Sequence, residues 1–462
     1  MRFYDREREI KVLKKILKDF RIAIVGRRRV GKTRLVEHVF KDAVTFFVPA
    51  EKSEKEIIAS WNEDYPGLNL PRVESFREFF SFVFTYLKDR VVFIDEIQNF
   101  LKVNKSFLYD LQRLIDKHRP RLVVTGSLIS VMKKMIQDEK QPLYGRFDYI
   151  IKLKELDFKT VYKICKDFNI SFEDSIKLYS IFGGIPKYYE IVEKLESFEL
   201  KSFVKDMFVF YPRPLYEEVR VILKEEFGGE YKTFFSILSA IARGRNKQGE
   251  IASFLGRKEH HITKYLNLLK QEFEVIERVT PVVGGKRGIY KISSNIFEFW
   301  FDNVWRYNYF IEQGNEGMLS KIIDRKLDLY VSRKFEDLIL TLFKNNVFKF
   351  NYHKVGKQWG KIKGKPKGEN VYEIDVVALN EEEKQILFGE CKWQSNVNAE
   401  KIVKSLAEKA GFVQWFNNER REIFAVFAKS FKKRLKSFEG KPVHCFDLKD
   451  LERVLKVGKR KV

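Results

Sequence analysis

Short apolar runs alternate with amphipathic stretches through the first part of the chain. The runs are rich in β-branched residues, which favours buried strands, and the stretches between them place apolar residues at helical spacing. The clearest runs are Arg21–Val25, Val44–Val48, Val91–Ile94 and Leu122–Thr125. A helix is also predicted over Phe3–Phe20, because its apolar residues share one face. Strands that alternate with helices predict an α/β domain built on a parallel sheet.

The first strand runs directly into a phosphate-binding loop. This loop reads G-x-x-x-x-G-K-T, and a helical stretch follows it. Its glycines let the backbone turn tightly, and its N–H groups form an anion site with the helix N-terminus. Lys32 supplies charge for the β- and γ-phosphates, and Thr33 supplies a hydroxyl for Mg²⁺. The predicted ATP–Mg²⁺ site comprises Gly26, Arg27, Arg28, Arg29, Val30, Gly31, Lys32 and Thr33.

Two carboxylates close the third apolar run. Asp95 and Glu96 follow Val91–Ile94, which is the pattern of a Walker B strand. Asp95 is expected to hold the Mg²⁺ shell, and Glu96 to orient and deprotonate the attacking water. An ordinary acidic strand end is the alternative, and the phosphate loop upstream makes it the weaker one.

Three later positions could complete the nucleotide site. Ser127 follows a strand at the sheet edge where ligands bind, although a plain helix cap explains it equally well. Arg146 offers a guanidinium that could act as a finger on the phosphates of its own or a neighbouring subunit. The turn Phe182–Pro186 could close over the base.

The middle of the chain is predicted to be helical and to end in a short hairpin. Two helices joined by a glycine-containing turn, and then two strands, are typical of a winged helix-turn-helix. The helices are expected over Tyr231–Ala242, Lys247–Gly256 and Glu259–Lys270, and the strands over Val275–Val279 and Gly288–Ile292.

This region carries basic residues where a winged helix contacts DNA. The second helix of the motif would enter the major groove, and the loop of the hairpin would contact phosphates. The alternative is a winged helix that serves only packing or protein contacts. No metal is predicted at the two histidines, because no cysteine or acid follows them at ligand spacing. The expected DNA contacts are Lys258, His260, His261, Lys264, Lys286 and Arg287.

The last third of the chain contains a second pair of predicted strands. A helical stretch is expected to reach about Asn345, and a strand-rich part to begin at Val347–His353. A loop rich in glycine and lysine is expected at Gly356–Asn370. The strands Val371–Leu379 and Gln385–Trp393 would then form an antiparallel hairpin.

Charged residues in this hairpin have the types that metal-dependent phosphodiester cleavage needs. Alternation places Glu390 and Lys392 on one face, with Asp375 on the neighbouring strand and Glu336 in the preceding helix as a fourth candidate. Asp375 and Glu390 are expected to hold a divalent metal, and Lys392 to position or activate water. Because Glu-x-Lys is frequent in a chain rich in both residues, an exposed hairpin with ordinary charges stays open as the alternative.

Composition adds a polyanionic partner to this picture. The chain of 462 residues has a net charge of +24 and a pI of about 9.6. This excess favours a polyanionic partner, either nucleic acid or an anionic membrane surface. A surface rich in Lys and Glu, of the kind found in thermophiles, is the alternative without such a partner, and nucleic acid is favoured over it. No apolar run is long enough to span a bilayer, and three scattered cysteines argue against structural zinc. We therefore expect a cytoplasmic protein that binds DNA and no membrane.

Taken in order, the motifs of the first half resemble those of the archaeal ATPase family, a branch of P-loop proteins close to the AAA+, STAND and origin-recognition ATPases. The resemblance implies ATP binding, with Ser127 as a sensor and Pro186 against adenine. The segments that carry it are Asp5–Glu9, Gly26–Thr33, Ile94–Gln98, Thr125–Ser127, Leu143–Arg146 and Gly183–Pro186.

The stretch from about Phe335 onward resembles the PD-(D/E)XK nuclease-like domain that follows archaeal ATPases of this family. The residues that match its active-site types are Glu336, Asp375, Glu390 and Lys392. The resemblance implies a restriction-endonuclease-like α/β fold. The basic segments Lys432–Arg434 and 459–461 would serve simple DNA binding equally well.

Together these patterns predict a multidomain α/β protein. Residues 1–210 would form a P-loop ATPase domain with a helical lid, residues 211–310 a winged helix-turn-helix, and residues 311–462 the nuclease-like domain. The favoured function is an ATPase that acts on DNA, with ATP and Mg²⁺ as cofactors and a candidate metal-dependent nuclease; a homo-oligomer fits this function. Two alternatives stay open: a STAND-type switch that holds ATP and binds partners, and a catalytically inert DNA-binding protein.

Overall fold

The structure is a computed structural model that describes residues 2–15, 20–285, 288–348, 350–362, 364–366 and 369–456. Its contacts divide the chain into two compact units. The first unit comprises Met1–Asp157, Gly184–Leu195 and Gln271–Glu274, and the second comprises Phe158–Gly183, Glu196–Lys270 and Val275–Val462. Most of the helices predicted as the ATPase lid thus pack with the second unit, as do the regions predicted as a winged helix and a nuclease-like domain.

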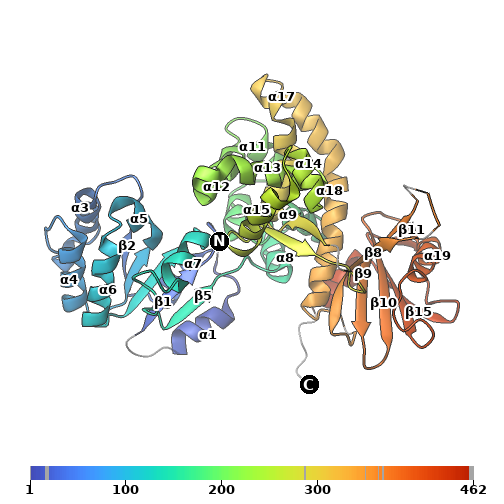
Figure 1. Ribbon diagram of the computed structural model, residues 1–462, viewed down its shortest axis with the longest axis horizontal. Helices are drawn as coiled ribbons and strands as arrows, with labels where there is room; N and C mark the ends of the chain where they lie inside the picture. The colour runs from blue at the N-terminus through green and yellow to red at the C-terminus, as the bar shows by residue number, and fades with distance from the viewer. Residues whose placement is uncertain are drawn as a thin grey trace. The chain divides into compact units, whose positions relative to one another are not determined.

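A five-stranded parallel sheet forms the centre of the first unit, with strand order β2-β3-β4-β1-β5 (Figure 1). Its strands are β1 (Arg21–Val25), β2 (Val44–Phe47), β3 (Val92–Asp95), β4 (Leu122–Gly126) and β5 (Tyr149–Lys152). Its helices are α1 (Glu7–Lys15), α2 (Lys32–Val39), α3 (Glu54–Asp64), α4 (Phe76–Tyr86), α5 (Phe100–Val103), α6 (Phe107–His118), α7 (Ile129–Gln137) and α10 (Pro186–Glu193). The expected parallel α/β sheet is therefore present.

Both faces of this sheet are buried, which explains why its strands are apolar without interruption. Successive side chains of a strand point to opposite faces. Ile22 and Ile24 accordingly join a cluster with α1 and α2, whereas Ala23 and Val25 join a phenylalanine-rich cluster with α3, α4, α6 and α7. The carboxyl ends of all five strands are thereby left at one edge, where α/β proteins bind ligands.

The predicted first helix begins later than expected, because helix α1 starts at Glu7 rather than Phe3. Asp5 and Arg6 have φ values of 58° and 78°, which are left-handed and incompatible with a helix. The buried Arg6 side chain bonds backbone carbonyls elsewhere in the unit, so a tertiary contact overrides the local helical pattern. Residues 16–19, also within the prediction, lie outside the described residues.

A six-stranded mixed sheet and a set of helices form the second unit. The sheet has the order β14-β15-β12-β10-β9-β8. Its strands are β8 (Lys354–Lys361), β9 (Val371–Asn380), β10 (Gln385–Lys392), β12 (Arg421–Ala428), β14 (Ser437–Phe438) and β15 (Lys441–Phe446); β11 (Val397–Asn398) pairs with β13 (Phe431–Lys433). Helix α19 (Ala399–Ala410) contributes Val403 and Leu406 to the core of this sheet.

The helices that precede this sheet include a 29-residue helix, α18 (Glu316–Lys344). The other helices of the unit are α8 (Phe158–Asp167), α9 (Phe172–Phe182), α11 (Leu200–Phe208), α12 (Pro214–Phe227), α13 (Tyr231–Ala242), α14 (Gln248–Phe254), α15 (Glu259–Gln271), α16 (Asn295–Phe299), α17 (Asn308–Glu312) and α20 (Leu448–Lys456). None of the helices in the described part of the chain is both long and apolar enough to cross a membrane.

The middle region has the predicted order of three helices and an antiparallel hairpin. The helices are α13, α14 and α15, and the hairpin pairs β6 (Ile276–Val279) with β7 (Ile289–Ile292). The loop of the hairpin is not wholly exposed: Val282 is buried and belongs to the core of the six-stranded sheet. The main-chain N–H of Val282 donates to the carbonyl of Lys357 at 3.1 Å. This loop is therefore docked on strand β8.

The predicted loop Gly356–Asn370 is partly wrong. Strand β8 occupies Lys354–Lys361, in antiparallel pairing with β9, and the described residues of Val347–His353 form no strand. Glycine and lysine have low β-propensity, so local sequence hides this strand. Pairing with β9 supplies the ladder hydrogen bonds that local propensity does not predict. The antiparallel pairing of β9 with β10 was predicted and is confirmed.

Substituting Gly184 should destabilise the first unit. A Cβ at this position would lie 1.8 Å from the main-chain oxygen of Leu156, which cannot easily move because it belongs to the backbone. Gly184→Ala is expected to lower the free energy of unfolding by about 3 kcal/mol, measured by chemical denaturation. Gly67→Ala is the control, because a Cβ there meets nothing within 4 Å. Equal stability of the two variants would contradict the close approach.

Candidate nucleotide site and carboxylate site

Strand β1 leads directly into the phosphate loop. Two positions of this loop require glycine, each for a different structural reason. A Cβ on Gly26 would lie 2.5 Å from the carbonyl oxygen of Leu153. Gly31 precedes α2 with a φ of 92°, which side chains rarely adopt. The first glycine thus allows close packing against the chain after β5, and the second allows the turn into the helix.

Lys32 lies inside this loop rather than in solvent. Its amine donates to the carbonyls of Gly26 at 2.9 Å and Arg27 at 3.1 Å. Burial lowers the pKa of Lys32, and the nearby carboxylates of Glu96 and Asp95 act in the opposite direction. The ammonium therefore lies among the loop carbonyls, where a phosphate-binding loop requires a cation.

Asp95 is held by two threonine hydroxyls. Thr33 Oγ1 donates to Asp95 Oδ2 at 2.7 Å, and the hydroxyl of Thr125 donates to Asp95 Oδ1. The main-chain N–H of Glu96 also reaches Oδ1, at 3.1 Å. A hydroxyl and a carboxylate oxygen side by side are the hard ligands that Mg²⁺ prefers, so this pair fits the predicted ion.

Ser127 contacts the carboxylate of Glu96. Ser127 Oγ donates to Glu96 Oε2 at 2.6 Å, and the side-chain amide of Gln98 donates to the same oxygen. Glu96 itself has a φ of 58°, so the chain turns sharply directly after Asp95. The two residues predicted as base and sensor are therefore brought together at the carboxyl edge of the sheet.

Two buried polar residues of this site were not predicted. Thr125, the last polar residue of β4, binds Asp95, and Gln98 binds Glu96. Gln98 Oε1 is buried and accepts no hydrogen bond from the described residues. A signal existed for Thr125, because a hydroxyl that ends an apolar strand lies at the ligand-binding edge. Gln98 had no comparable signal, because its contact depends on the turn at Glu96.

Arginines of the loop and of α2 connect this site to the segment that contains Pro186. Pro186 is the first residue of α10, and the N–H of Gly184 just before it donates to Glu155 Oε2 at 3.2 Å. This segment is therefore adjacent to the phosphate loop. The connecting contacts are Arg27–Glu155 at 3.6 Å, Arg34–Glu190 at 2.6 Å and Arg29 over the Tyr188 ring at 6.0 Å.

Arg6 is a further residue that was not predicted. Its guanidinium is buried and donates to the carbonyl of Val30, within the phosphate loop, at 3.1 Å. It also donates to the carbonyl of Lys154, after β5, at 2.7 Å. Arg6 therefore fixes the loop against the neighbouring strand end, although it lies far from both in sequence.

Arg146 lies away from the phosphate loop of its own chain. Its guanidinium pairs with Asp116 of α6 through bonds of 3.0 and 2.9 Å. Two residues later, Asp148 bonds the main chain and side chain of Arg21, at the amino end of β1. Since β1 has five residues and a strand rises about 3.3 Å per residue, roughly 15 Å separate this edge from the loop. Arg146 is therefore too far from the phosphate loop of its own chain to act there as the predicted finger.

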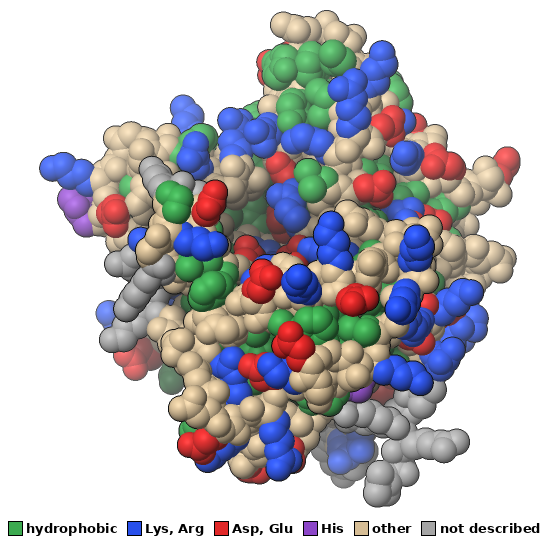
Figure 2. Space-filling view, turned by 90° about the vertical axis from the view of Figure 1, so that its right-hand side faces the viewer, with side chains coloured by type: hydrophobic (Ala, Val, Ile, Leu, Met, Phe, Trp, Pro, Cys, Tyr) green, Lys and Arg blue, Asp and Glu red, His purple; other side chains and the backbone are tan. Residues whose placement is uncertain are grey.

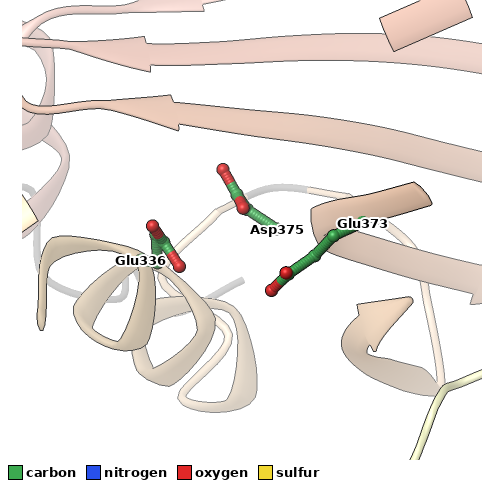
Figure 3. A group of neighbouring side chains, drawn as sticks. All are labelled: Glu336, Glu373 and Asp375. Atoms are coloured by element: carbon green, nitrogen blue, oxygen red, sulfur yellow. The ribbon is translucent and has the colours of Figure 1, made fainter. Parts of the chain in front are cut away.

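A second group of charged side chains lies in the other unit. Glu336 of α18 and Glu373 and Asp375 of β9 point toward a common space (Figure 3), with one oxygen of each within 4.8 Å of the others. Glu336 and Asp375 were predicted, and Glu373 was not. Glu373 lies two residues before Asp375 on the same strand, so the alternation of side chains could have indicated it. Three converging carboxylates fit a divalent cation.

Glu390 is held by lysines beside this group. Lys392 donates to its Oε1 at 2.8 Å. Lys409 of α19 donates to both oxygens, at 3.1 and 3.0 Å. The main-chain N–H of Cys391 donates to Asp375 Oδ2 at 2.8 Å, which joins the two strand ends. The four predicted residues therefore gather in one place, and Lys409 joins them unpredicted.

Asp375 is buried beside other carboxylates. Burial, followed by the charges of Glu336 and Glu390, raises the pKa of Asp375 to about 7. Burial also raises the pKa of Glu336, against the attraction of Lys357. The ionised forms of these carboxylates are therefore unfavourable, and this favours binding of a cation or a proton near neutral pH.

The residues predicted to contact DNA on α15 and directly before it are exposed. Lys258, His260, His261 and Lys264 all face solvent, whereas Ile262, Leu266 and Leu269 are buried. Lys286 and Arg287 lie outside the described residues, as do residues 459–461. Figure 2 shows Lys and Arg side chains dispersed among Asp and Glu on one face of the molecule. The positive charge of that face is therefore not collected in one patch.

Removing the charge of Asp375 should change how stability depends on pH. Because the pKa of Asp375 in the folded protein is about 7 and that of an unfolded aspartate about 4, the folded protein binds the extra proton between these values. Its stability then falls as the pH rises through this range. Asp375→Asn keeps the acceptor for Cys391 and removes this fall. We expect the metal-free variant to have the higher thermal midpoint above about pH 7. Parallel pH profiles for the two proteins would contradict this.

Comparison with known proteins gives matches to two families. Residues 3–192 match a family described as an ATPase domain predominantly from Archaea. Residues 300–402 match a family described as archaeal and bacterial proteins of unknown function. An uncharacterised protein of Methanocaldococcus jannaschii is 33% identical over 479 aligned positions, which cover 97% of this chain and 99% of that protein.

Solved structures give more distant similarities. A Walker-type ATPase of Pyrococcus abyssi is 19% identical over 65% of this chain and 96% of its own, with a TM-score of 0.48. The ORC2 protein of Aeropyrum pernix is 14% identical over 72% of this chain and 96% of its own, with a TM-score of 0.40. The near full-length relative and the ATPase match together show that the chain belongs to the archaeal ATPase family, and it is an ATPase by that membership.

Proposed function

We propose that the protein hydrolyses ATP and acts on DNA, and that its second unit cleaves phosphodiester bonds with the help of a divalent metal. The observation that carries the cleavage is the convergence of Glu336, Glu373 and Asp375 beside a lysine-held Glu390. Hard carboxylate oxygens and nearby ammonium groups are what a metal-dependent phosphodiesterase requires.

In the first unit, the side chains of the nucleotide site have separate proposed roles in hydrolysis. Lys32 binds the β- and γ-phosphates, and Thr33 and Asp95 hold Mg²⁺, which neutralises phosphate charge when it is bound. Glu96 orients the attacking water and accepts its proton. Ser127, through its bond to Glu96, positions that carboxylate.

In the second unit, α15 is proposed to bind DNA as the recognition helix of a winged helix-turn-helix, together with Lys258 directly before it. Lys258, His260, His261 and Lys264 would face the major groove. Lys286 and Arg287 would contact phosphates next to the groove. The exposure of the helix face supports this role.

The carboxylate site would cleave the bound strand by attack of water on phosphorus, with departure of one ester oxygen. Glu336, Glu373 and Asp375 are the proposed metal ligands, with the adjacent Glu390 as a fourth. The metal would supply a polarised water when it is bound. Burial lowers the pKa of Lys392, but its bond with Glu390 and the negative charges around it together outweigh burial and raise the pKa. Lys392 therefore stays protonated, which suits it to positioning water or phosphate rather than to removing a proton. Lys409 orients Glu390 from the other side.

A STAND-type switch without nuclease activity is the second candidate. The observation that favours it is the double hydrogen bond to Glu96 Oε2 from Ser127 and Gln98. An oxygen that already accepts two bonds is a weaker base for water. Such a protein would hold ATP with little turnover and bind DNA or protein partners.

Substitutions in the first unit distinguish turnover from retention of ATP. Lys32→Ala should abolish hydrolysis, because the phosphates lose their cation. Glu96→Gln should bind ATP normally and hydrolyse it about 100-fold more slowly, because an amide cannot accept the proton. Nucleotide binding and steady-state hydrolysis measure these effects.

Ser127→Ala separates the two candidates: a slower rate of ATP hydrolysis supports positioning of Glu96 for catalysis, and a faster rate supports restraint of Glu96 in a switch.

A nuclease assay tests the second unit. Plasmid and single-stranded DNA are incubated with Mg²⁺ or Mn²⁺, with and without ATP. Asp375→Ala should reduce cleavage by about 100-fold or more, because a buried oxygen ligand is lost. Glu382→Ala is the control, since Glu382 is an exposed acid at the opposite end of the same hairpin. Lys32→Ala reports whether ATP controls cleavage. Intact DNA binding without cleavage under any condition would favour the switch.

A further inference from the structure

Lys357 faces Asp375 across a β-bulge. Gly356 pairs with Val377, and Gln358 pairs with Ile374. Between these two pairs, strand β8 has one residue and strand β9 has two. One residue of β8, Lys357, therefore faces two residues of β9, Asp375 and Val376. A bulge of this kind re-aims side chains, and bulges are frequent next to functional sites.

The amine of Lys357 contacts the converging carboxylates. It bonds Glu336 Oε2 and lies 3.6 Å from Glu373 Oε1. Only 16% of its side chain is exposed. Lys357 thus compensates, inside the protein, two of the three carboxylates that could hold a metal.

The main chain of Lys357 is fixed while its side chain ends in a flexible amine. Its carbonyl accepts the bond from Val282 in the docked hairpin loop. The next side chain, Gln358, bonds the main chain of Val283 at 2.9 Å and is buried. These contacts hold strand β8 in place, so the side chain is the part of Lys357 that can move away from the carboxylates.

The other two lysines of the site have a different partner. Lys392 and Lys409 both bond Glu390, which lies outside the group of three converging carboxylates. A divalent cation held by Glu336 and Asp375 would repel the ammonium of Lys357 and replace its bond to Glu336. The released ammonium would still be within one side-chain length of the site, where the scissile phosphodiester would bind.

We infer that Lys357 is an exchangeable cation of this site: it pairs with Glu336 and Glu373 when no metal is bound, and with a DNA phosphate when a divalent metal takes the carboxylates. This inference rests on the proposed action of the second unit on DNA. Metal and DNA then favour each other's binding, because DNA draws Lys357 away from the carboxylates that the metal needs, and the metal releases the Lys357 ammonium that DNA needs. By linkage, the factor by which metal tightens DNA binding equals the factor by which DNA tightens metal binding.

The test measures this coupling in the full-length protein without ATP. A fluorescent duplex is titrated with and without Ca²⁺, which takes oxygen ligands readily, and Ca²⁺ binding is followed by calorimetry. Any Ca²⁺ that still binds to Asp375→Asn is assigned to other sites of the protein. In the wild type, Ca²⁺ should tighten DNA binding about 10-fold. In Lys357→Gln this factor should fall below about 2-fold, and Ca²⁺ should bind the DNA-free variant more tightly than the wild type, because its competitor is gone.

Two matched variants keep the result interpretable. Lys357→Arg retains the charge and should retain most of the coupling, and its thermal midpoint shows whether the site tolerates substitution. Lys354→Gln removes a lysine from an exposed position of the same strand and should behave like the wild type. Full coupling in Lys357→Gln, or weaker Ca²⁺ binding by this variant, would overturn the inference. DNA binding that ignores Ca²⁺ in the wild type would also overturn it, while absence of DNA binding would overturn the proposed function as well.

Discussion

A carboxylate that leaves water needs hydrogen-bond donors or cations around it, and both sites of this protein are arranged around that requirement. In the first unit, neutral donors satisfy Asp95 and Glu96: the hydroxyls of Thr33, Thr125 and Ser127. These hydroxyls leave the negative charge in place, so the site can still attract Mg²⁺. The lysine of the loop lies nearby and bonds main-chain carbonyls rather than either acid.

The second unit meets the same requirement with charge. Lys392 and Lys409 compensate Glu390, and Lys357 compensates Glu336. Asp375 lacks such a cation at bonding distance among the described residues and accepts a main-chain N–H instead. Burial and the charges of Glu336 and Glu390 therefore raise the pKa of Asp375. The site is therefore sensitive to any ligand that brings positive charge or removes a lysine.

The hairpin loop after β6 would connect the two proposed activities of the second unit. The sequence predicts this loop as a basic wing for DNA, and the structure docks its first half on strand β8, with Val282 in the core of the sheet. DNA held by this hairpin would be close to the residue that faces Asp375. Binding and cleavage would then share one support instead of being joined by a flexible linker.

Local pattern alone determined much of this protein: the parallel sheet, the phosphate loop, the Walker B acids, and the hairpin that carries Asp375 and Glu390. Each of these features is formed by residues at short, fixed spacing, so one local stretch of sequence encodes it. Tertiary structure decided what depends on distant segments. It placed Arg6 against the phosphate loop, moved Arg146 to the far edge of the sheet, turned a glycine- and lysine-rich stretch into β8, and set Lys357 opposite Asp375. Such contacts leave no local signal, because each joins segments whose proximity only the folded chain creates.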